Sequence, residues 1–433
     1  MRTRGSRLDV AIIGNGIAGN SALWAIRNSG KNVRVALFSQ EDHPLYSPCA
    51  FYRYLAGEAQ LQKLLLKNLD SYTQENVMTF FGKNVSHVDL KTREAMVEDR
   101  AIPFDQLILA TGSKAIFPPI RGNERRGVFS LKTLDDAKSI NNYPAKRAVV
   151  LGSGPIGIEC AIGLRKKGLE VTVVEILDRI LPRLFDPEPS RMCQRVLEEH
   201  GIQVKTEEKV LEILGGERVT GVGTNKAEIS CDMVIMGVGV SPHTELAKAI
   251  GVSIGDLGGI QTDESMLTNI EGVYACGDCI ESMDIVTQQK GLSLLWINAK
   301  KQGWVAGYNC VGVRRKFMGS YSSTILDIFG MYAMSSGKTQ TQLQGRDDLE
   351  VIDGKFNPGY YRLIGSGNHL VGIQLIDRIE NAGRLFSKML RRDDLSDLMK
   401  TTHDDPLLSM KPWNSWVCKY RTPRLGSAKS KGD

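Results

Sequence analysis

Two short segments of the chain each place three glycines at the spacing G-x-G-x-x-G. The glycines are Gly14, Gly16 and Gly19 in the first segment and Gly152, Gly154 and Gly157 in the second. In this pattern the first glycine turns the chain, the second lets the backbone approach a pyrophosphate, and the third brings a helix against a strand. The phosphates then lie at the positive N-terminus of that helix. Two such segments predict two binding sites for dinucleotides.

Each glycine segment lies between a predicted strand and a predicted helix. The apolar run 9–13 enters the first segment, a helical pattern continues to residue 30, and alternation resumes at 33–37. The second copy begins at 148–151, continues as a helical pattern to residue 168 and ends in a strand at 171–174. A strand, a glycine turn, a helix and a parallel strand make one nucleotide-binding unit. The repeat therefore predicts an α/β fold with two Rossmann-like dinucleotide-binding domains.

The end of the second strand in each copy is the expected place of an acid that binds a ribose diol. Glu175 stands there in the second copy, and its charge would repel the 2′-phosphate of NADP, which favours NADH. Arg179 either moderates this preference or is an ordinary surface arginine. In the first copy the place is taken by Ser39 and the nearest acid is Glu41, so either residue could hold the ribose.

Composition and charge exclude several other classes of protein. A chain of 433 residues with 42% hydrophobic residues has room for two or three folded domains. Apolar runs such as 233–240 are far shorter than the roughly 20 residues of a membrane-spanning helix, and eight scattered cysteines favour the cytoplasm over a disulfide-rich secreted protein. The net charge of +6 comes without a basic face interleaved with aromatics, which argues against nucleic acid and leaves an acidic protein partner open.

Five motifs follow one another in the order of a known family. They are DVAIIGNGIAG, FDQLILATGS, VVLGSGPIGIECAIGLRKKGLEVTVVE, MGVGVSPHTEL and GVYACGDCIE. With them the chain resembles the FAD- and NAD(P)-dependent pyridine nucleotide-disulfide oxidoreductases, in the branch of NADH oxidases and ferredoxin reductases. The resemblance implies that the first glycine turn holds FAD and the second holds NAD(H). It also implies a NAD domain inserted in the FAD domain, and an α+β C-terminal interface domain that pairs subunits into an oligomer.

The resemblance divides the chain into five parts. The FAD-binding domain would comprise 1–117 and 251–317, the NAD-binding domain 118–250, the C-terminal interface domain 318–408, and a basic aromatic tail 409–433. Within the interface domain, alternating stretches at 360–364 and 370–376 flank a Gly-Ser-Gly-Asn turn and predict a hairpin. A helical segment is expected at 382–390.

The resemblance also assigns residues to the two nucleotides. The residues expected to contact FAD are Gly14, Gly16, Ile17, Ala18, Gly19, Ser39, Glu41, Val85, Ala110, Thr111, Gly112, Gly277 and Asp278. Those expected to contact NAD(H) are Gly152, Gly154, Pro155, Ile156, Gly157, Glu159, Glu175 and Gly239. Asp278 would bond the ribityl chain of the flavin. Glu159 matches a family glutamate near the nicotinamide, and its alternative is an ordinary first-turn acid favoured by the helix dipole.

Cys49 is the cysteine with a candidate catalytic role. It lies in the aromatic-rich segment 46–54, which resembles the single redox cysteine segment of NADH oxidases and coenzyme A-disulfide reductases. A thiolate beside a flavin and a helix start would have a lowered pKa and could attack a disulfide. The alternative is a small buried residue in a proline-bounded loop. It is favoured because Ile17 stands where the oxidases have a histidine, and because 20–26 holds no basic residue for coenzyme A.

No metal site is expected. Cys276 and Cys279 form a C-x-x-C pair, but they overlap the glycine-aspartate motif, whose backbone the family commits to flavin contacts. The six histidines show no metal-ligand spacing. The cysteine spacings of ferredoxins are also missing, so any iron–sulfur cluster must belong to a partner.

Three functions remain open. In the first, a hydride passes between NAD(H) and FAD and single electrons pass between FAD and an iron–sulfur protein or subunit. In the second, Cys49 serves an NADH-dependent disulfide, polysulfide or oxygen reductase. In the third, the fold is a scaffold without catalysis, which the intact glycine turns and the intact Ala110-Thr111-Gly112 and Gly277-Asp278 motifs argue against.

The end of the chain favours the first function. From Ser409 it combines six lysines and arginines with Trp413, Trp416 and Tyr420, which suggests docking on another subunit, although a solvated tail is the alternative. The family also includes flavoprotein subunits of larger assemblies. Among them are those that resemble the NADH-forming subunit of anaerobic 2-oxoacid (phenylglyoxylate-type) dehydrogenases.

Overall fold

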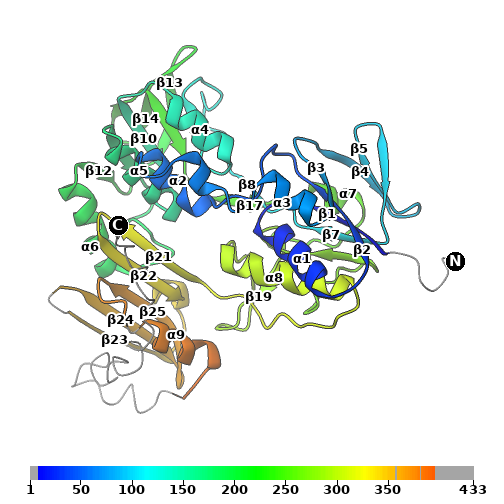
Figure 1. The fold of residues 1–433 in the computed structure, drawn as a ribbon. Coiled ribbons are helices and arrows are strands. Elements are labelled where there is room, and N and C mark those ends of the chain that lie inside the picture. The colour runs from blue at the N-terminus through cyan, green and yellow to red at the C-terminus, as the bar shows by residue number, and fades with distance from the viewer. Residues whose placement is uncertain (1–7, 356–357, 381, 395–433) are drawn as a thin grey trace, which may run out of the picture.

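The computed structural model describes residues 8–355, 358–380 and 382–394 of the chain. Its first Rossmann-like unit, on the right in Figure 1, is a five-stranded sheet in which all strands run parallel. In spatial order the strands are β18 (Val273–Ala275), β7 (Gln106–Leu109), β1 (Leu8–Ile13), β2 (Val33–Phe38) and β3 (Val77–Phe80). Their side chains are mostly buried, as expected for a parallel sheet covered on both faces.

Two helices of this unit pack unusually close to each other. They are α1 (Ile17–Asn28), which follows the first glycine turn, and α8 (Trp296–Cys310). A Cβ on Gly303 of α8 would lie 2.0 Å from the Ala18 carbonyl oxygen, and one on Gly307 would lie 2.3 Å from that of Ala22. The absence of side chains at these two positions therefore allows α8 to lie directly against α1.

The second Rossmann-like unit, at the upper left in Figure 1, repeats the parallel plan. Its sheet order is β12 (Ile202–Lys205), β11 (Glu170–Val174), β10 (Arg147–Leu151), β16 (Met233–Met236) and β9 (Val128–Ser130). Its helices are α4 (Leu134–Asn142), α5 (Pro155–Lys166) and α6 (Pro187–Glu199). An antiparallel sheet of β13 (Val210–Gly215), β14 (Val219–Thr224) and β15 (Glu228–Ser230) adjoins it. The two predicted Rossmann-like domains are thus confirmed.

The second unit is inserted in the first through two paired strands. The chain leaves the first unit in β8 (Ser113–Ala115) and returns in β17 (Val240–Pro242). These strands are antiparallel, with Ala115 opposite Val240 and Ser113 opposite Pro242. The Thr111 hydroxyl also donates to the His243 carbonyl at 2.6 Å. The outgoing and returning segments are therefore held side by side.

The third unit, at the lower left in Figure 1, is an antiparallel sheet with one helix. Its strand order is β21 (Ser323–Ile328), β22 (Met331–Gly337), β25 (His369–Ile376), β24 (Tyr360–Ser366) and β23 (Leu349–Lys355). The helix α9 (Ala382–Arg391) buries Leu385 and Met389 against this unit. The predicted hairpin and helix are confirmed, with Gly367 at positive φ in the turn.

The shorter elements complete the described chain. They are α2 (Phe51–Leu55), α3 (Leu69–Gln74), α7 (Glu245–Ala249), β4 (Val85–Asp89), β5 (Glu94–Val97), β6 (Arg100–Pro103), β19 (Ser282–Met283), β20 (Lys290–Gly291), and the 3₁₀ turns η1 (Pro48–Ala50), η2 (Leu61–Leu64) and η3 (Thr341–Leu343). The predicted tail 409–433 and the last part of the predicted interface domain lie outside the described residues. Among the helices described, none is long and apolar enough to cross a membrane.

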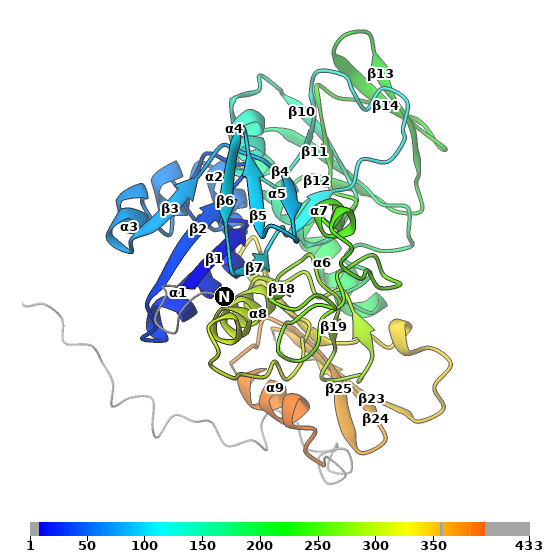
Figure 2. The same cartoon turned by 90° about the vertical axis from the view of Figure 1, so that its right-hand side faces the viewer.

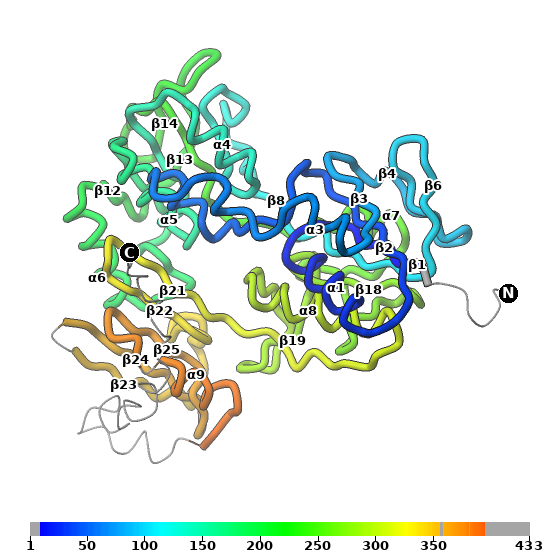
Figure 3. Tube along the Cα trace, viewed as in Figure 1, coloured from blue at the N-terminus to red at the C-terminus, as the bar shows by residue number. Residues whose placement is uncertain are grey.

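The segment that carries Cys49 crosses from the first unit to the second. Figure 3 shows this stretch of the tube reaching α5. Phe51, Leu55 and Leu64 are buried in the same core cluster as Ile158 and Ile162 of α5. A Cβ on Gly163 of α5 would lie 2.6 Å from the Tyr52 carbonyl oxygen, so α2 lies directly against that helix.

Candidate functional site

The residues predicted to bind FAD gather at one edge of the first sheet. Parallel strands end at a common edge, and the register aligns Ile13 of β1 with Phe38 of β2 and with Leu109 of β7. The predicted segments 14–19, 39–41, 110–112 and 277–278 each follow one of these strands or β18. Val85 lies apart from these strand ends, buried at the start of β4. The carboxyl edge of an open α/β sheet is the general ligand site of such folds.

In the first glycine turn, the middle glycine has free space around it, whereas the two outer glycines pack against backbone. A Cβ on Gly14, whose φ is +120°, would lie 1.9 Å from the Ala110 carbonyl oxygen, and one on Gly19 would lie 1.9 Å from that of Gly14. A Cβ on Gly16 would meet nothing within 4 Å. Gly14 and Gly19 are thus required by the fold itself, whereas Gly16 leaves room at the N-terminus of α1. That room is what a pyrophosphate needs.

The second glycine turn repeats this arrangement. A Cβ on Gly152 would lie 2.7 Å from the Gly237 carbonyl oxygen, and one on Gly157 would lie 2.3 Å from that of Gly152. A Cβ on Gly154, the residue before α5, would again meet nothing within 4 Å. Both turns therefore fit the pyrophosphate of a dinucleotide.

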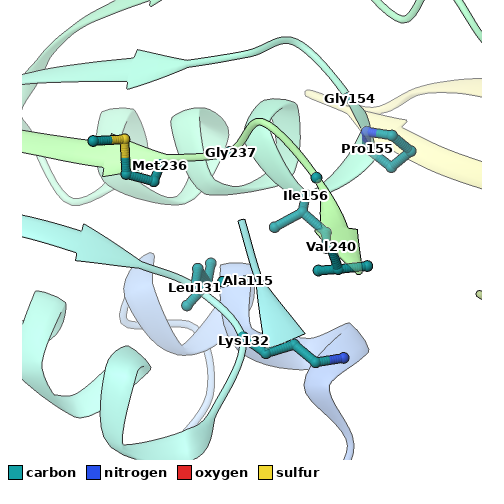
Figure 4. Close-up of a pocket in the computed structure, with 10 residues that line it drawn as sticks. Ala115, Leu131, Lys132, Gly154, Pro155, Ile156, Met236, Gly237 and Val240 are labelled. Carbon is teal, nitrogen blue, oxygen red and sulfur yellow. The ribbon is translucent and has the colours of Figure 1, made fainter. Parts of the chain in front are cut away.

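A cleft lies in front of the second glycine turn. It is lined by Ala115, Leu131, Lys132, Gly154, Pro155, Ile156, Met236, Gly237, Gly239 and Val240. Figure 4 shows these residues around the start of α5, with contributions from the strand that carries Ala115 and the strand that carries Met236. Four of the predicted NAD residues, namely Gly154, Pro155, Ile156 and Gly239, are brought together here. Gly154 and Gly239 contribute no side chain to this lining.

Glu175 is fixed at the glycine turn by hydrogen bonds. It is 6% exposed, and one carboxylate oxygen accepts from the backbone N–H of Ser153 at 2.9 Å and from its hydroxyl at 2.6 Å. The other oxygen accepts from the Leu177 N–H at 2.9 Å. Arg179 points elsewhere, because its guanidinium bonds Asp178 and donates to the Thr341 hydroxyl at 3.0 Å. The negative charge at the ribose position is therefore not offset by Arg179.

Asp278 belongs to a cluster that includes a lysine which the sequence did not single out. The Ser113 hydroxyl donates to Asp278 Oδ2 at 2.9 Å, and Lys132 Nζ donates to Ser113 Oγ at 2.8 Å. Lys132 Nζ also lies 3.6 Å from Asp278 Oδ2. Since Lys132 lines the cleft as well, it places a positive charge between the predicted flavin and nicotinamide positions. The sequence does contain a sign of the position of Lys132. It directly precedes the capping box that starts at Thr133, and Asp136 of that box accepts from the Lys132 N–H.

Glu41 and Ser39 both lie at the end of β2 and are partly exposed. The Tyr46 hydroxyl donates to the Glu41 carboxylate at 2.8 Å, and the Leu134 N–H donates to the same hydroxyl at 3.3 Å. Burial and the nearby Glu41 charge raise the pKa of Tyr46, so the phenol stays protonated as a donor. Glu41 is thus oriented by a residue of the Cys49 segment. The geometry leaves both Ser39 and Glu41 as candidates for the ribose.

Asn15 ties the first glycine turn to the loop before Cys49. Its side-chain amide donates to the His43 carbonyl at 2.9 Å, and its amide oxygen accepts from the Tyr72 hydroxyl at 2.9 Å. That hydroxyl in turn accepts from the Leu45 N–H at 3.0 Å. The position of this loop is therefore coupled to the position of the predicted phosphate-binding turn.

Glu159 is a partly buried carboxyl group on α5. Burial raises its pKa to about 7. A carboxyl group whose pKa is raised by burial is a candidate for binding or proton transfer. The alternative of a first-turn acid is wrong, because α5 begins at Pro155 and has no acidic residue in its first turn.

Cys49 differs from its expectation. It is exposed at η1, so the alternative of a buried residue is wrong. The pKa of its thiol is raised, first by partial burial of the sulfur and then by the negative field of Glu159. A lowered pKa is expected for a thiolate beside a flavin, and it stays a prediction.

The C-x-x-C pair shows no sign of a redox or metal site. Cys276 and Cys279 are fully buried, and burial raises both pKa values. The Cys279 thiol donates to the Cys276 carbonyl at 3.3 Å. Within the described ranges, no cluster of three potential metal-ligating side chains is found.

Comparison with known proteins places this geometry in a family. The profile of the pyridine nucleotide-disulphide oxidoreductases matches residues 8–303. The NADH oxidase of Methanocaldococcus jannaschii is 35% identical over 339 residues, which is 76% of this chain and 75% of that protein. Two relatives from Bacillus subtilis are longer: the chain covers 49% of an NAD(P)H nitrite reductase and 54% of an assimilatory nitrate reductase electron transfer subunit, at 30% and 26% identity over 92% and 96% of this chain.

Two solved structures superpose on most of the chain. The NAD-dependent persulfide reductase from A. fulgidus superposes with a TM-score of 0.86 at 27% identity, covering 90% of this chain and 78% of that one. A ferredoxin reductase from Rhodopseudomonas palustris superposes with a TM-score of 0.82 at 25% identity, covering 93% and 99%.

Proposed function

The chain belongs to the pyridine nucleotide-disulphide oxidoreductase family, and from that premise we propose that it passes electrons between NAD(H) and an iron–sulfur protein through FAD. The family and the relatives make it an FAD-containing NAD(H) oxidoreductase. Bound FAD supplies two kinds of chemistry, hydride exchange with nicotinamide and single-electron exchange with a metal centre. The proposal beyond the family is the identity of the second reaction partner.

The chain's own residues would perform defined tasks in this reaction. Gly16 and Gly154 leave space for the two pyrophosphates, and Glu175 presents a fixed carboxylate to the ribose of NADH. Asp278, held by Ser113, would bond the flavin side chain. Glu159, with a pKa near 7, can hold or release a proton beside the nicotinamide at neutral pH.

The observation that carries the proposal is the raised pKa of the Cys49 thiol. A disulfide or polysulfide reductase needs a thiolate at this position, because the thiolate is the attacking species. The surroundings of Cys49 work against ionisation, since burial of the sulfur and the Glu159 charge both raise the pKa. Electron transfer from flavin to an iron–sulfur centre forms no bond to sulfur and has no such requirement.

The charge of the surface beside the flavin motif supports an acidic partner. Gln302 of α8 accepts from the Gly277 N–H at 2.9 Å, so α8 lies next to the Asp278 motif. Lys300 and Lys301 on this helix are exposed. The Arg315 guanidinium lies over the rings of Trp304 and Tyr308, which adds a third exposed cation. Such a surface favours and steers an acidic electron carrier.

Two relatives support the kind of partner. One is the ferredoxin reductase from Rhodopseudomonas palustris, and the other is the nitrate reductase electron transfer subunit of Bacillus subtilis. A role as one subunit of a larger assembly, such as an NADH-forming subunit of a 2-oxoacid dehydrogenase, fits the same electron path. The exposed Ile325 and Tyr332 of β21 and β22 support pairing of subunits through the third unit.

The second candidate is an NADH-dependent disulfide, polysulfide or oxygen reductase that uses Cys49. Exposure of Cys49 and the likeness to the persulfide reductase from A. fulgidus favour it. A bound flavin would have to reverse the pKa shift for this route to run efficiently.

The change Cys49→Ser separates the two candidates. The variant should bind FAD as the wild type does and should keep most of its NADH-driven reduction of a one-electron dye and of an iron–sulfur protein. The Arg53→Ala variant, which removes an exposed side chain of the adjoining α2, is the control for disturbance of this segment. A collapse of dye reduction in Cys49→Ser, with flavin content and the control unchanged, would make the thiol reductase the better assignment, because loss of a nucleophile costs many orders of magnitude.

A further inference from the structure

The loop 176–186 joins β11 to α6 and is bonded to the second glycine turn. It begins directly after Glu175, and its first two residues, Ile176 and Leu177, are exposed apolar side chains. The Leu181 N–H donates to the Ser153 carbonyl in the glycine turn at 3.0 Å. The loop is therefore bonded to the same turn that Glu175 holds, and any shift of the loop would be transmitted to that turn.

The last residue of this loop, Asp186, is bonded to the third unit. It is 1% exposed, and its carboxylate accepts from the N–H groups of Gln340 and Thr341 at 3.0 Å and 3.1 Å. It also accepts from the Thr341 hydroxyl at 3.1 Å and from the Gln374 side-chain amide at 2.7 Å. Gln374 returns the bond, since its amide oxygen accepts from the Asp186 N–H at 2.9 Å.

This use of Asp186 is not the ordinary one for its position. An aspartate at the N-cap of a helix normally accepts from the backbone of the first turn. Asp186 is the N-cap of α6, but its side chain makes no capping bond to that helix. The carboxylate is committed to the third unit, so helix capping does not explain the residue.

Two more bonds hold the same loop to the third unit. The Ser335 hydroxyl of β22 donates to the Leu184 carbonyl at 2.6 Å, and Arg179 donates to the Thr341 hydroxyl at 3.0 Å. Arg362 of β24 is the cation near Asp186, with Nη1 at 3.9 Å from the carboxylate. Figure 2 shows α6 above the sheet that contains β24 and β25. Four segments of the third unit, namely β22, η3, β24 and β25, therefore contact this one loop.

We propose that Asp186 is a positioning residue for NAD(H), through which the third unit sets the affinity of the second nucleotide site. Its bonds to η3 and β25 fix the end of the loop, and the Leu181–Ser153 bond carries that constraint to the glycine turn. Without them the loop would have to be ordered when the nucleotide binds, which weakens binding. The inference rests on NAD(H) binding at the second glycine turn and is independent of which protein receives the electrons.

The test uses the full chain loaded with FAD and the variant Asp186→Asn. Calorimetric titration with NAD⁺ should show a dissociation constant raised by about fivefold or more, and the KM for NADH in dye reduction should rise by a similar factor. The kcat at saturating NADH should change little, because the lost contact positions the loop and does not touch the reacting atoms. FAD content should be unchanged.

The double variant Asp186→Asn with Gln374→Glu is the rescue. It keeps one negative charge near Arg362 and restores the bond between residues 186 and 374 with its direction reversed, but the Gln340 N–H still lacks its acceptor. It should therefore recover part of the NAD⁺ affinity. Ser336→Ala is the matched control. This change removes the hydrogen bond of 2.8 Å between the Ser336 and Ser323 hydroxyls, which lies inside the third unit and does not involve the loop. It should leave the NAD⁺ affinity unchanged.

An Asp186→Asn variant with a lowered melting temperature but wild-type NAD⁺ affinity would overturn the proposal, because the contact would then serve stability alone. If that variant does not fold, Thr341→Val removes one of the four bonds to the carboxylate and should still weaken NAD⁺ binding. Wild-type NAD⁺ affinity in Thr341→Val would then overturn the proposal. A wild type that reduces the dye with NADH but fails to reduce any iron–sulfur protein would refute the proposed partner and leave this inference intact.

Discussion

Replacing Glu159 with glutamine should stabilise the protein in a pH-dependent way. Its pKa is about 7 in the folded chain against 4.5 in the unfolded chain. The unfolded state therefore ionises first as pH rises, and the wild type loses stability between the two pKa values. From these values the loss is about 1 kcal/mol at pH 5 and about 3 kcal/mol at pH 8. Glutamine cannot ionise, so Glu159→Gln should lack this loss.

Urea unfolding of the FAD-loaded protein at the two pH values measures the effect. The stability gained by Glu159→Gln should be about 2 kcal/mol larger at pH 8 than at pH 5. The control is Glu188→Gln on α6, because Arg191 and Lys355 lower the pKa of that partly exposed carboxyl group and its loss should bring no such gain. A difference between Glu159→Gln and wild type that is the same at both pH values would refute the reasoning, since it would show that Glu159 ionises normally.

Two further changes test the nucleotide sites. Gly16→Val should abolish flavin absorbance while the flavin-free chain still folds, because a Cβ at residue 16 meets nothing within 4 Å. Gly19→Ala should impair folding itself, because a Cβ at residue 19 would lie 1.9 Å from the Gly14 carbonyl oxygen. Retained flavin in Gly16→Val would contradict the pyrophosphate assignment. The wild type should prefer NADH to NADPH, and Glu175→Ala should reduce this preference by about 1 to 3 kcal/mol, or roughly 5- to 150-fold, in steady-state kinetics with both nucleotides. A wild type that prefers NADPH would show that another residue overrides Glu175.

The parts of the fold that follow from local pattern were predictable. Apolar runs such as 9–13 and 148–151 are typical of parallel strands, and the glycines after them leave few alternatives to a tight turn and a helix. The structure shows why each glycine is needed. Gly14 and Gly19 pack against backbone, whereas Gly16 has free space around it.

The parts that depend on distant segments were not predictable. Lys132 reaches Asp278 only because Ser113 lies between them, and Ser113 is placed there by the pairing of β8 with β17. The raised pKa of Cys49 could not be predicted, because burial of the sulfur is its largest cause and the second cause, Glu159, is far away in the sequence. From the sequence, Asp186 is an ordinary N-cap residue before Pro187. The neighbouring residues do not indicate that its carboxylate is bonded to β25.

The antiparallel pairing of β8 with β17 has a consequence for engineering. Because Ala115 and Val240 lie opposite each other, the two ends of the inserted unit almost meet. A segment whose ends are adjacent can be exchanged as a cassette between related chains without stretching the host, or replaced by a short turn. A transplanted cassette would bring its own choice between NADH and NADPH through the residue at position 175. It would also need a matching partner for Asp186 in the recipient's last unit.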